Sequence, residues 1–282
     1  MISLIVSTRN RNPELDRFLV HLDQQTYRDF EVLVVDQNAG DGVPALLERH
    51  TFPRQYFHSD KPGVARGRNV ALKAAQGDIL SFPDDDCWYG PELLEAVAKW
   101  FDEHRDIDML CVVECNPEGE PMVPRYPPAP GFCTDQPVGL FPERSVWIAQ
   151  SSMVFMRRQV RDRIGFMNES IGVGADTKYQ SGEETDYFLR AMHAGFRLYF
   201  EPSIKVFHPE LREISRLYRT AYPYSVGNGH MLRMHECSLP RLMAVVCRAL
   251  GGAAANTFRG RRKETMVYLL RAKGILAGYF GW

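Results

Sequence analysis

The sequence contains little of what marks a membrane-spanning or disulfide-rich protein. No run of 18 apolar residues occurs, because Arg248 interrupts the longest candidate, residues 242–258. Six cysteines in 282 residues form no Cys-x-x-Cys pair, so we expect buried thiols rather than disulfides or zinc. The chain starts on a strand-like run, so we expect no signal peptide. We therefore expect a cytoplasmic protein, either free or peripheral on the inner face of the cytoplasmic membrane.

Net charge is also nearly absent, because 34 Lys or Arg residues offset 35 Asp or Glu residues to give −1. This average excludes the basic footprint that nucleic-acid-binding proteins usually carry, so no nucleic acid is expected as a partner. The charge is unevenly distributed, however. Residues 237–282 contain eight basic residues and one acid, for a net charge of +7, so residues 1–236 carry −8. A basic, apolar, aromatic-ended segment is typical of docking on an anionic membrane surface. Packing on the rest of the chain or in a homodimer explains it equally well.

Hydrophobic periodicity predicts an α/β architecture. Short apolar runs predict strands at residues 2–7, 32–35, 54–58, 79–82, 109–113, 153–156, 197–200 and 204–207. Helical spacing predicts helices from Pro13 and at 43–50, 64–76, 91–104 and 183–194. Such alternation favours a parallel sheet whose strand ends, and hence the ligand site, share one edge. From residue 211 the chain is expected to be helical, with breaks near 227–229, Pro240 and 251–252.

Two irregular segments interrupt this alternation. Residues 116–142 hold eight of the 18 prolines, and residues 164–180 contain three glycines. Loops of this length inside a compact domain are usually functional. We expect both segments to shape a substrate pocket and to close over it.

Three adjacent carboxylates follow a predicted buried strand, in the sequence PDDDCW. Asp84, Asp85 and Asp86 repel one another, so the run costs free energy unless a cation neutralises it. Divalent cations prefer carboxylate oxygens, and Mn²⁺ or Mg²⁺ bridging a diphosphate fits this run best. A solvated acidic turn is the alternative.

A second acidic group opens a predicted helix, in the sequence SGEETDYFLR. Glu183, Glu184 and Asp186 lie where the helix dipole stabilises negative charge. Helix capping alone is one interpretation, but three acids exceed what capping needs. One of the three is therefore a candidate general base.

Basic residues complete the set of candidates. Arg66 and Arg68 in GVARGRN open a predicted helix and suit phosphate binding, with surface charge as the alternative. The segment lacks the Gly-Lys-Ser/Thr ending of a P-loop. His208 follows a predicted strand, where a lone histidine is either structural or a ligand.

In order along residues 1–209, the blocks STRNR, EVLVVDQN, GVARGRN, ILSFPDDDCWYGPE and GEETDYFLRAMHAGFRLYFEP resemble the family 2 glycosyltransferases. The resemblance implies an α/β fold of the GT-A type, a Rossmann-like nucleotide-diphospho-sugar transferase with a mixed sheet flanked by helices. It places this catalytic domain at residues 1–210. Residues 211–282 would form a C-terminal helical appendage that docks on membrane or dimerises.

The resemblance also implies roles for residues that contact the nucleotide sugar. Thr8 and Arg9 would line the base, and Asp36 would hold the base or ribose. Arg68 would lie near the nucleotide. Asp84 and Asp85 would contact the nucleotide sugar, with Asp84 nearer the ribose.

A metal ion and a base are implied as well. Asp86 and Asp84 would bind Mn²⁺ or Mg²⁺, with His208 as a third contact. Glu184 falls where the family usually has a catalytic aspartate. Because glutamate is longer by one methylene, Glu183 and Asp186 remain alternatives for the base.

The implied activity is metal-dependent, inverting transfer of a hexose from a nucleotide-diphosphate sugar, UDP-sugar favoured, to a hydroxyl of a glycan or lipid-linked acceptor. The Gln-x-x-Arg-Trp motif of processive enzymes is missing, which favours transfer of one sugar at a time. Gln-Asn-Ala-Gly at residues 37–40 replaces the commoner pattern and leaves the nucleotide base open. One alternative is a non-catalytic nucleotide-sugar-binding or membrane-docking module. Another is a sugar-phosphate nucleotidyltransferase, which is disfavoured because STRNRNPE lacks glycine.

Overall fold

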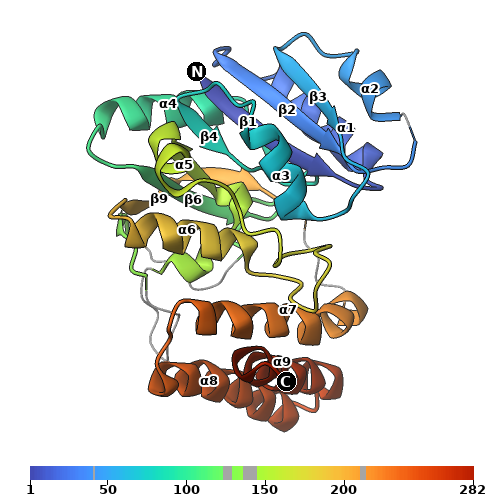
Figure 1. The fold of residues 1–282 in the computed structure, drawn as a ribbon, viewed down its shortest axis with the longest axis vertical. Coiled ribbons are helices and arrows are strands. Elements are labelled where there is room, and N and C mark those ends of the chain that lie inside the picture. Colours follow the sequence, from blue (N-terminus) through green and yellow to red (C-terminus); the bar gives the residue numbers. More distant parts are fainter. Residues whose placement is uncertain (41, 123–128, 136–144, 210–213) are drawn as a thin grey trace.

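The computed structural model describes the chain except for residues 41, 123–128, 136–144 and 210–213. Its centre is one mixed sheet (Figure 1). The strands are β1 (Ile2–Thr8), β2 (Phe30–Asp36), β3 (Arg54–His58), β4 (Ile79–Ser81), β5 (Trp88–Tyr89), β6 (Met109–Cys115), β7 (Gly131–Phe132), β8 (Val154–Arg157) and β9 (Leu198–Phe207). They follow the order β3-β2-β1-β4-β8-β6-β9-β5, and β7 pairs with β9.

Helices cover this sheet because their apolar residues share one face. They are α1 (Asn12–Asp23), α2 (Gly42–Leu47), α3 (Val64–Leu72), α4 (Leu93–Glu103), α5 (Arg158–Ile164) and α6 (Glu183–His193), with short 3₁₀ turns η1 (Val146–Ile148) and η2 (Ser151–Met153). In α1, for example, Leu15, Phe18, Leu19 and Leu22 are all buried. These side chains join the strands in a single hydrophobic core.

The first half of the sheet is parallel, as the sequence predicts. The strands β1, β2, β3 and β4 all run in one direction. The expectation of a parallel sheet is wrong for β8, which runs antiparallel to both β4 and β6. It is also wrong for β5 and β7, which run antiparallel to β9. A long connection precedes β8, so the strand can join the sheet in either direction. The spacing of apolar residues does not indicate which direction it takes. The mixed sheet implied by the family resemblance is the one observed.

One further boundary differs from the sequence prediction. The predicted strands at 197–200 and 204–207 are one ten-residue strand, β9. Residues 123–128 and 136–142 of the proline-rich segment 116–142 lie outside the described residues. All six cysteines are free, and Cys247 is exposed rather than buried.

Three long helices form a separate layer below the sheet (Figure 1). They are α7 (Ile214–Met234), α8 (Leu239–Phe258) and α9 (Arg262–Phe280). The breaks expected near 227–229 and 251–252 are wrong, because both glycine pairs lie inside helices. A Cβ at Gly229 would lie 2.1 Å from the carbonyl oxygen of Ile275, and one at Gly278 would lie 2.0 Å from that of Val226. The glycines therefore serve close packing of α7 against α9 rather than helix termination.

The helical layer also contacts the rest of the chain. His230 of α7 stacks on Tyr179 with ring centroids 3.7 Å apart. Lys178 donates to the backbone carbonyls of Gly281 and Trp282. No helix within the described ranges is long and apolar enough to cross a membrane.

Candidate active site

The candidate site lies where the strand order reverses. The chain builds β1, β2 and β3 outward in one direction and then returns to place β4 on the other side of β1. Crevices form at the carboxyl ends of strands at such a point. Thr8 ends β1, Asp36 ends β2, and Asp84, Asp85 and Asp86 come just after β4. The sheet thereby brings these predicted site residues to one edge.

His208 joins the carboxylates through strand pairing. Trp88 pairs with Phe207 in the antiparallel β5–β9 ladder, and the two rings stack with centroids 5.8 Å apart. The same register sets His208 beside Asp86, with Nε2 and Oδ1 at 3.1 Å. One ligand atom each from Asp84, Asp86 and His208 lies within 4.8 Å of the others.

These three residues fit a divalent cation. Two carboxylates suit Mg²⁺ and Mn²⁺ alike, whereas an imidazole nitrogen is a ligand more typical of transition metals. The donor set is therefore compatible with either ion. Within the described part of the chain, no second group of three such residues is close enough to hold a metal.

The charges of His208 and Asp86 stabilise each other. Burial lowers the pKa of His208, but the hydrogen bond and charge of Asp86, together with the charge of Glu114, outweigh burial and raise it to about 9. Burial raises the pKa of Asp86, and the contacts with His208 and Arg11 reverse this and leave it lowered. The histidine is thus a cation held against a carboxylate.

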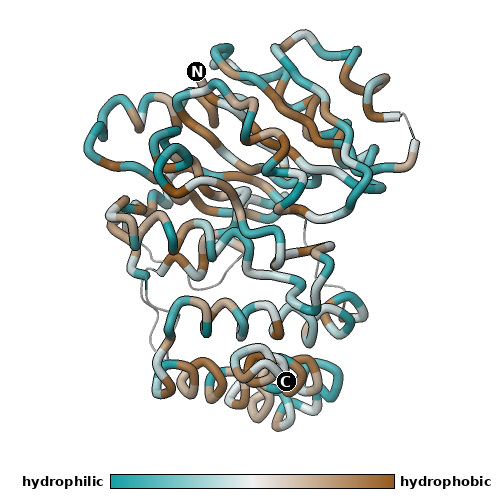
Figure 2. Tube along the Cα trace, in the orientation of Figure 1, coloured by the Kyte–Doolittle hydropathy of each residue, from teal (hydrophilic) through white to brown (hydrophobic). Residues whose placement is uncertain are grey.

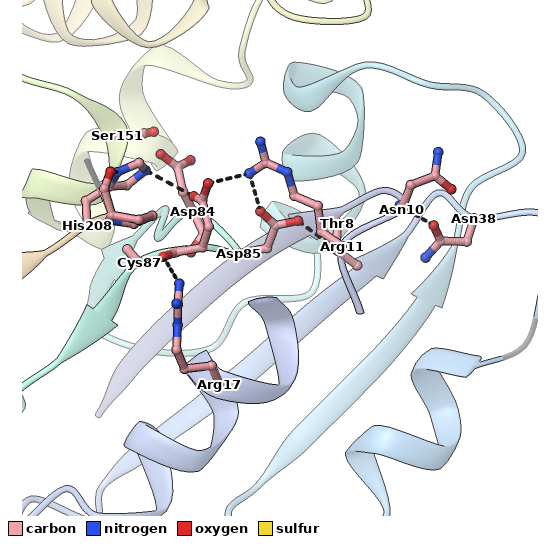
Figure 3. A network of polar contacts seen from close by, with 12 residues as sticks. Thr8, Asn10, Arg11, Arg17, Asn38, Asp84, Asp85, Cys87, Ser151 and His208 are labelled. Carbon is pink, nitrogen blue, oxygen red and sulfur yellow. Dashed lines mark hydrogen bonds and ion pairs between the residues drawn. The ribbon is translucent and has the colours of Figure 1, made fainter. Parts of the chain in front are cut away.

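Arg11 is a site residue that sequence reasoning missed. Its Nη1 lies 2.9 Å from Oδ1 of Asp85 and 2.6 Å from Oδ2 of Asp86 (Figure 3). Burial raises the pKa of Asp85 to about 6, although Arg11 and the Thr8 hydroxyl, 2.8 Å away, act against it. Arg9, the predicted contact in this loop, is exposed. The block STRNR contained the signal, but the resemblance pointed to the other arginine.

Arg68 connects the two acidic groups. Its Nη2 donates to Oδ1 of Asp84 at 2.9 Å and to Oγ of Ser151 at 2.7 Å. The side chain is buried, and Nε and Nη1 have no hydrogen-bond partner among the described residues. Buried donors without a partner cost free energy. An anionic ligand such as a diphosphate would satisfy them.

The three acids of α6 have different surroundings. Glu183 is buried with its carboxyl against the Gly172 turn, where a Cβ would lie 2.7 Å from Cδ. Asp186 is buried and paired with Arg190 at 3.0 Å and with His235 at 3.1 Å. Glu184 alone of the three keeps substantial exposure, with 25% of its side chain accessible.

Glu184 also has the pKa that suits a general base. Burial raises its pKa to about 7, the negative charge of Glu183 adds to this, and Arg68 acts against it. Oε2 accepts a hydrogen bond from the backbone N–H of Ser151 at 2.9 Å, which fixes the carboxylate in place. A carboxylate with a pKa near neutrality both holds and releases a proton at working pH.

Asp36 occupies the far end of this edge. It is fully buried, and Oδ1 accepts hydrogen bonds from the backbone and side-chain nitrogens of Asn38. Oδ2 accepts from the Tyr56 hydroxyl at 3.2 Å. Asn38 in turn accepts from the backbone N–H of Asn10 (Figure 3). These contacts order the loops after β1 and β2 into one wall.

Glu114 is a second residue that sequence reasoning missed. Burial raises its pKa, while His208 and a 2.9 Å hydrogen bond from Ser152 lower it. It lies in β6, where it is the lone charged residue of an apolar strand. A charged residue in such a run is rarely buried without a partner, and this was the available signal.

Comparison with solved structures defines the fold. Staphylococcus aureus TarS residues 1–349, in complex with UDP-GlcNAc, superposes with a TM-score of 0.61 and 17% identity, covering 99% of this chain and 92% of that one. A mannosyltransferase from Pyrobaculum calidifontis, PcManGT, in complex with GDP-Man and Mn²⁺, gives 0.64 and 17%, covering 99% and 87%. The fold is that of the GT-A glycosyltransferases.

Sequence comparison then identifies the family. The pattern that defines glycosyl transferase family 2 matches residues 3–165, and the chain belongs to this family. An uncharacterized glycosyltransferase of Haemophilus influenzae is 33% identical over 111 residues, which are 39% of this chain and 37% of that protein. The chain spans between 28% and 37% of the length of three such curated relatives.

Proposed function

We propose that the protein transfers a hexose, with inversion, from a nucleotide-diphosphate sugar to a hydroxyl of a glycan or lipid-linked acceptor, one sugar at a time. One observation carries this proposal: the cluster of Asp84, Asp86 and His208 lies beside Arg68, which in turn reaches Glu184, with Nη1 and Oε2 3.9 Å apart. A cation site, an anion-binding arginine and a base thus adjoin one another. This is the set that displacement of a nucleoside diphosphate requires.

The leaving group is stabilised by Arg68 and the cation site. In the described part of the chain, Nε and Nη1 of Arg68 are buried donors without a hydrogen-bond partner, and they suit the oxygens of the departing diphosphate. We propose Asp84, Asp86 and His208 as the residues that hold Mn²⁺ or Mg²⁺. When bound, the ion neutralises charge that develops on the diphosphate.

Glu184 is proposed as the base that removes the proton of the acceptor hydroxyl. Glu183 is held against the Gly172 turn, and Asp186 is paired with Arg190 and His235. Attack on the side opposite the leaving group inverts the anomeric carbon in a single displacement.

The nucleotide is proposed to contact Thr8, Arg9, Asp36 and Asp85. TarS in complex with UDP-GlcNAc shares this fold, and so does PcManGT in complex with GDP-Man. UDP-sugar remains our preferred donor for this chain. A thermal-shift panel of UDP-sugars and GDP-sugars with Mn²⁺ tests it, because a ligand that binds the native state raises the melting temperature. No stabilisation by any sugar nucleotide would contradict the proposal.

We further propose that residues 1–210 are the catalytic domain and that residues 211–282 dock it on anionic membrane. Large apolar side chains are exposed on α8 and α9, and Phe258 is 93% exposed. The hydropathy colouring shows apolar stretches along α8 (Figure 2). Exposed arginines at 259, 261 and 262 adjoin Phe258. Apolar insertion beside basic charge is the usual basis of interfacial binding.

Vesicle sedimentation tests this docking. We expect binding to vesicles that contain phosphatidylglycerol, weaker binding to pure phosphatidylcholine, and loss of binding in Phe258→Ser. Thr257→Ser on the same exposed turn is the matched control. Equal sedimentation of wild type and Phe258→Ser would contradict docking, and a dimer by light scattering would assign the apolar face to a second copy.

A further inference from the structure

A cavity lies between η1 and the three C-terminal helices. Its volume is about 600 Å³. Its aromatic and charged lining consists of Trp147, Arg216, Tyr224, Arg248, Tyr268 and Arg271. Three of the described lining residues are arginines, and none is an aspartate or glutamate. The sequence and the family resemblance assigned no role to this cavity.

The three arginines come from three different helices. Arg216 lies on α7, Arg248 on α8 and Arg271 on α9, so the helical layer gathers positive charge at one place. No ion pair joins Arg216 or Arg271 to an acid in the described ranges. Like charges repel, and an anion inside the cavity relieves that repulsion. Guanidinium groups match phosphate oxygens in geometry as well as charge.

The cavity wall is shaped by close packing. The Arg271 guanidinium lies over the Tyr268 ring, with Cζ 5.3 Å from the ring centroid. Gly252 of α8 makes room for this ring, because a Cβ there would lie 2.5 Å from its Cε1 atom. An aromatic wall with a few convergent charged groups is typical of a binding site for an organic ligand.

Two walls of the cavity are joined to the residues that hold Glu184. The backbone oxygen of Tyr224 accepts a hydrogen bond of 2.6 Å from Oγ of Ser181, two residues before α6 begins at Glu183. On the other side, Trp147 of η1 leads to Ser151, whose backbone N–H donates to Glu184. The cavity and the candidate base therefore share supporting residues in η1 and just before α6.

On the basis of the proposed glycosyl transfer, we propose that this arginine pocket (Arg216, Arg248 and Arg271) binds a phosphate or diphosphate group of the acceptor. The acceptor hydroxyl then points toward Glu184. The enzyme selects acceptors that carry phosphate, and two kinds of molecule supply that chemistry. One is a lipid-linked sugar diphosphate, and the other is a polyol-phosphate chain.

Calorimetric titration of the full chain tests the pocket directly. The probes are geranyl diphosphate and a glycerol-phosphate trimer, each added after Mn²⁺ and saturating UDP or GDP have filled the donor site. The test variant is Arg216→Gln with Arg271→Gln. The matched control is Arg219→Gln with Lys273→Gln, which removes the same charge from exposed positions on the same two helices. A variant with lysine at 216 and 271 keeps the charge and checks that the pocket still folds.

We expect the glutamine pair in the pocket to weaken probe binding by about tenfold or more, since each lost charge-assisted hydrogen bond costs about a factor of ten. The control pair should bind as wild type does, and the lysine pair should recover part of the affinity. Binding of geranyl diphosphate alone identifies a lipid-linked acceptor, and binding of the trimer alone identifies a polyol phosphate. Absence of binding to wild type, or equal weakening in the control, overturns the proposal.

Hydrolysis of the donor, measured as release of nucleoside diphosphate, is the experiment that separates this proposal from the proposed function. It depends on Arg68 and the cation site and should be unchanged in the pocket variants. If wild type releases none from any sugar nucleotide, the proposed function fails while the binding result stands.

Discussion

Nε2 of His208 lies 3.1 Å from Oδ1 of Asp86, and this contact joins the end of β9 to the turn after β4. The distance is within the range of a hydrogen bond between an imidazole and a carboxylate. The same two atoms are candidate ligands of a divalent cation. A proton on the histidine and a metal ion are thus alternative ways of balancing the charge of Asp86.

Removal of either ligand should abolish metal-dependent turnover. We expect Asp86→Asn and His208→Gln to lower kcat/KM by about 10²-fold or more, because charge on the leaving diphosphate loses its stabilisation. The measurement is nucleoside diphosphate release across a Mn²⁺ titration. Glu118→Gln, an exposed acid in a loop beyond β6, is the control and should behave as wild type does. Unchanged Mn²⁺ dependence in both variants would remove these residues from the metal site.

Kinetic and stability measurements should distinguish the roles of the three acids of α6. Glu184→Gln should lower kcat by about 10²- to 10⁴-fold while donor binding persists, as expected for loss of a general base. Asp186→Asn should mainly lower stability, by about 1–3 kcal/mol, since it breaks hydrogen bonds to Arg190 and His235. Full turnover in Glu184→Gln, or a larger loss of kcat in Glu183→Gln, would move the base to another residue.

The pKa of Glu184 predicts how activity depends on pH. A base with a pKa of about 7 is ionised above that value, so kcat/KM should rise as pH increases through 7 and then level off. The acidic limb should vanish from the residual activity of Glu184→Gln. A flat profile between pH 5 and 9 in wild type would contradict the assignment.

The same group should also affect stability. Its pKa in the folded state is raised above the ordinary value of 4.5, so the native state holds a proton that the unfolded state releases. Stability from this group is therefore fully present below about pH 4.5 and is lost as pH rises through 7. The melting temperature of Glu184→Gln should exceed that of wild type at pH 8 by more than at pH 5. The reverse order would contradict a raised pKa.

The packing of α7 against α9 can be tested with two glycines in similar helical backbone. Gly278→Ala should destabilise the protein by about 1–3 kcal/mol, because the added methyl group would overlap the carbonyl oxygen of Val226. Gly251→Ala meets nothing within 4 Å and should be neutral or stabilising by up to about 1 kcal/mol. Chemical denaturation of both variants gives the comparison, and equal stability would show that the helices are not tightly packed here.

Much of the fold was predictable because its signals are local. Helix α1 follows from the spacing of Leu15, Phe18, Leu19 and Leu22, and β1 and β2 are continuous apolar runs. The direction of β8 was not predictable, since it depends on how a long connection returns to the sheet. The glycines of α7 were misread for a related reason. A glycine that breaks a helix and one that admits a neighbouring helix look alike until the neighbour is known.

The candidate site was likewise predictable only where its residues are close together in the sequence. The acids after β4 and at the start of α6 are each adjacent in sequence, so they could be found as groups. Arg11 and Glu114 act through contacts with distant segments. The sequence alone could not show that the accessible member of the α6 acids is Glu184, because exposure depends on the Gly172 turn and on His235.

His208 connects two parts of the molecule that come from separate stretches of the chain. The proposed nucleotide-sugar site is formed by residues at the ends of β1, β2 and β4. His208 directly follows β9, the last strand before the helices that carry the arginine pocket. A metal ion held by Asp84, Asp86 and His208 would therefore connect the N-terminal part of the sheet to the start of the C-terminal helices. Metal loading should then slow amide hydrogen exchange in β9 and in the first turns of α7, far from the carboxylates themselves.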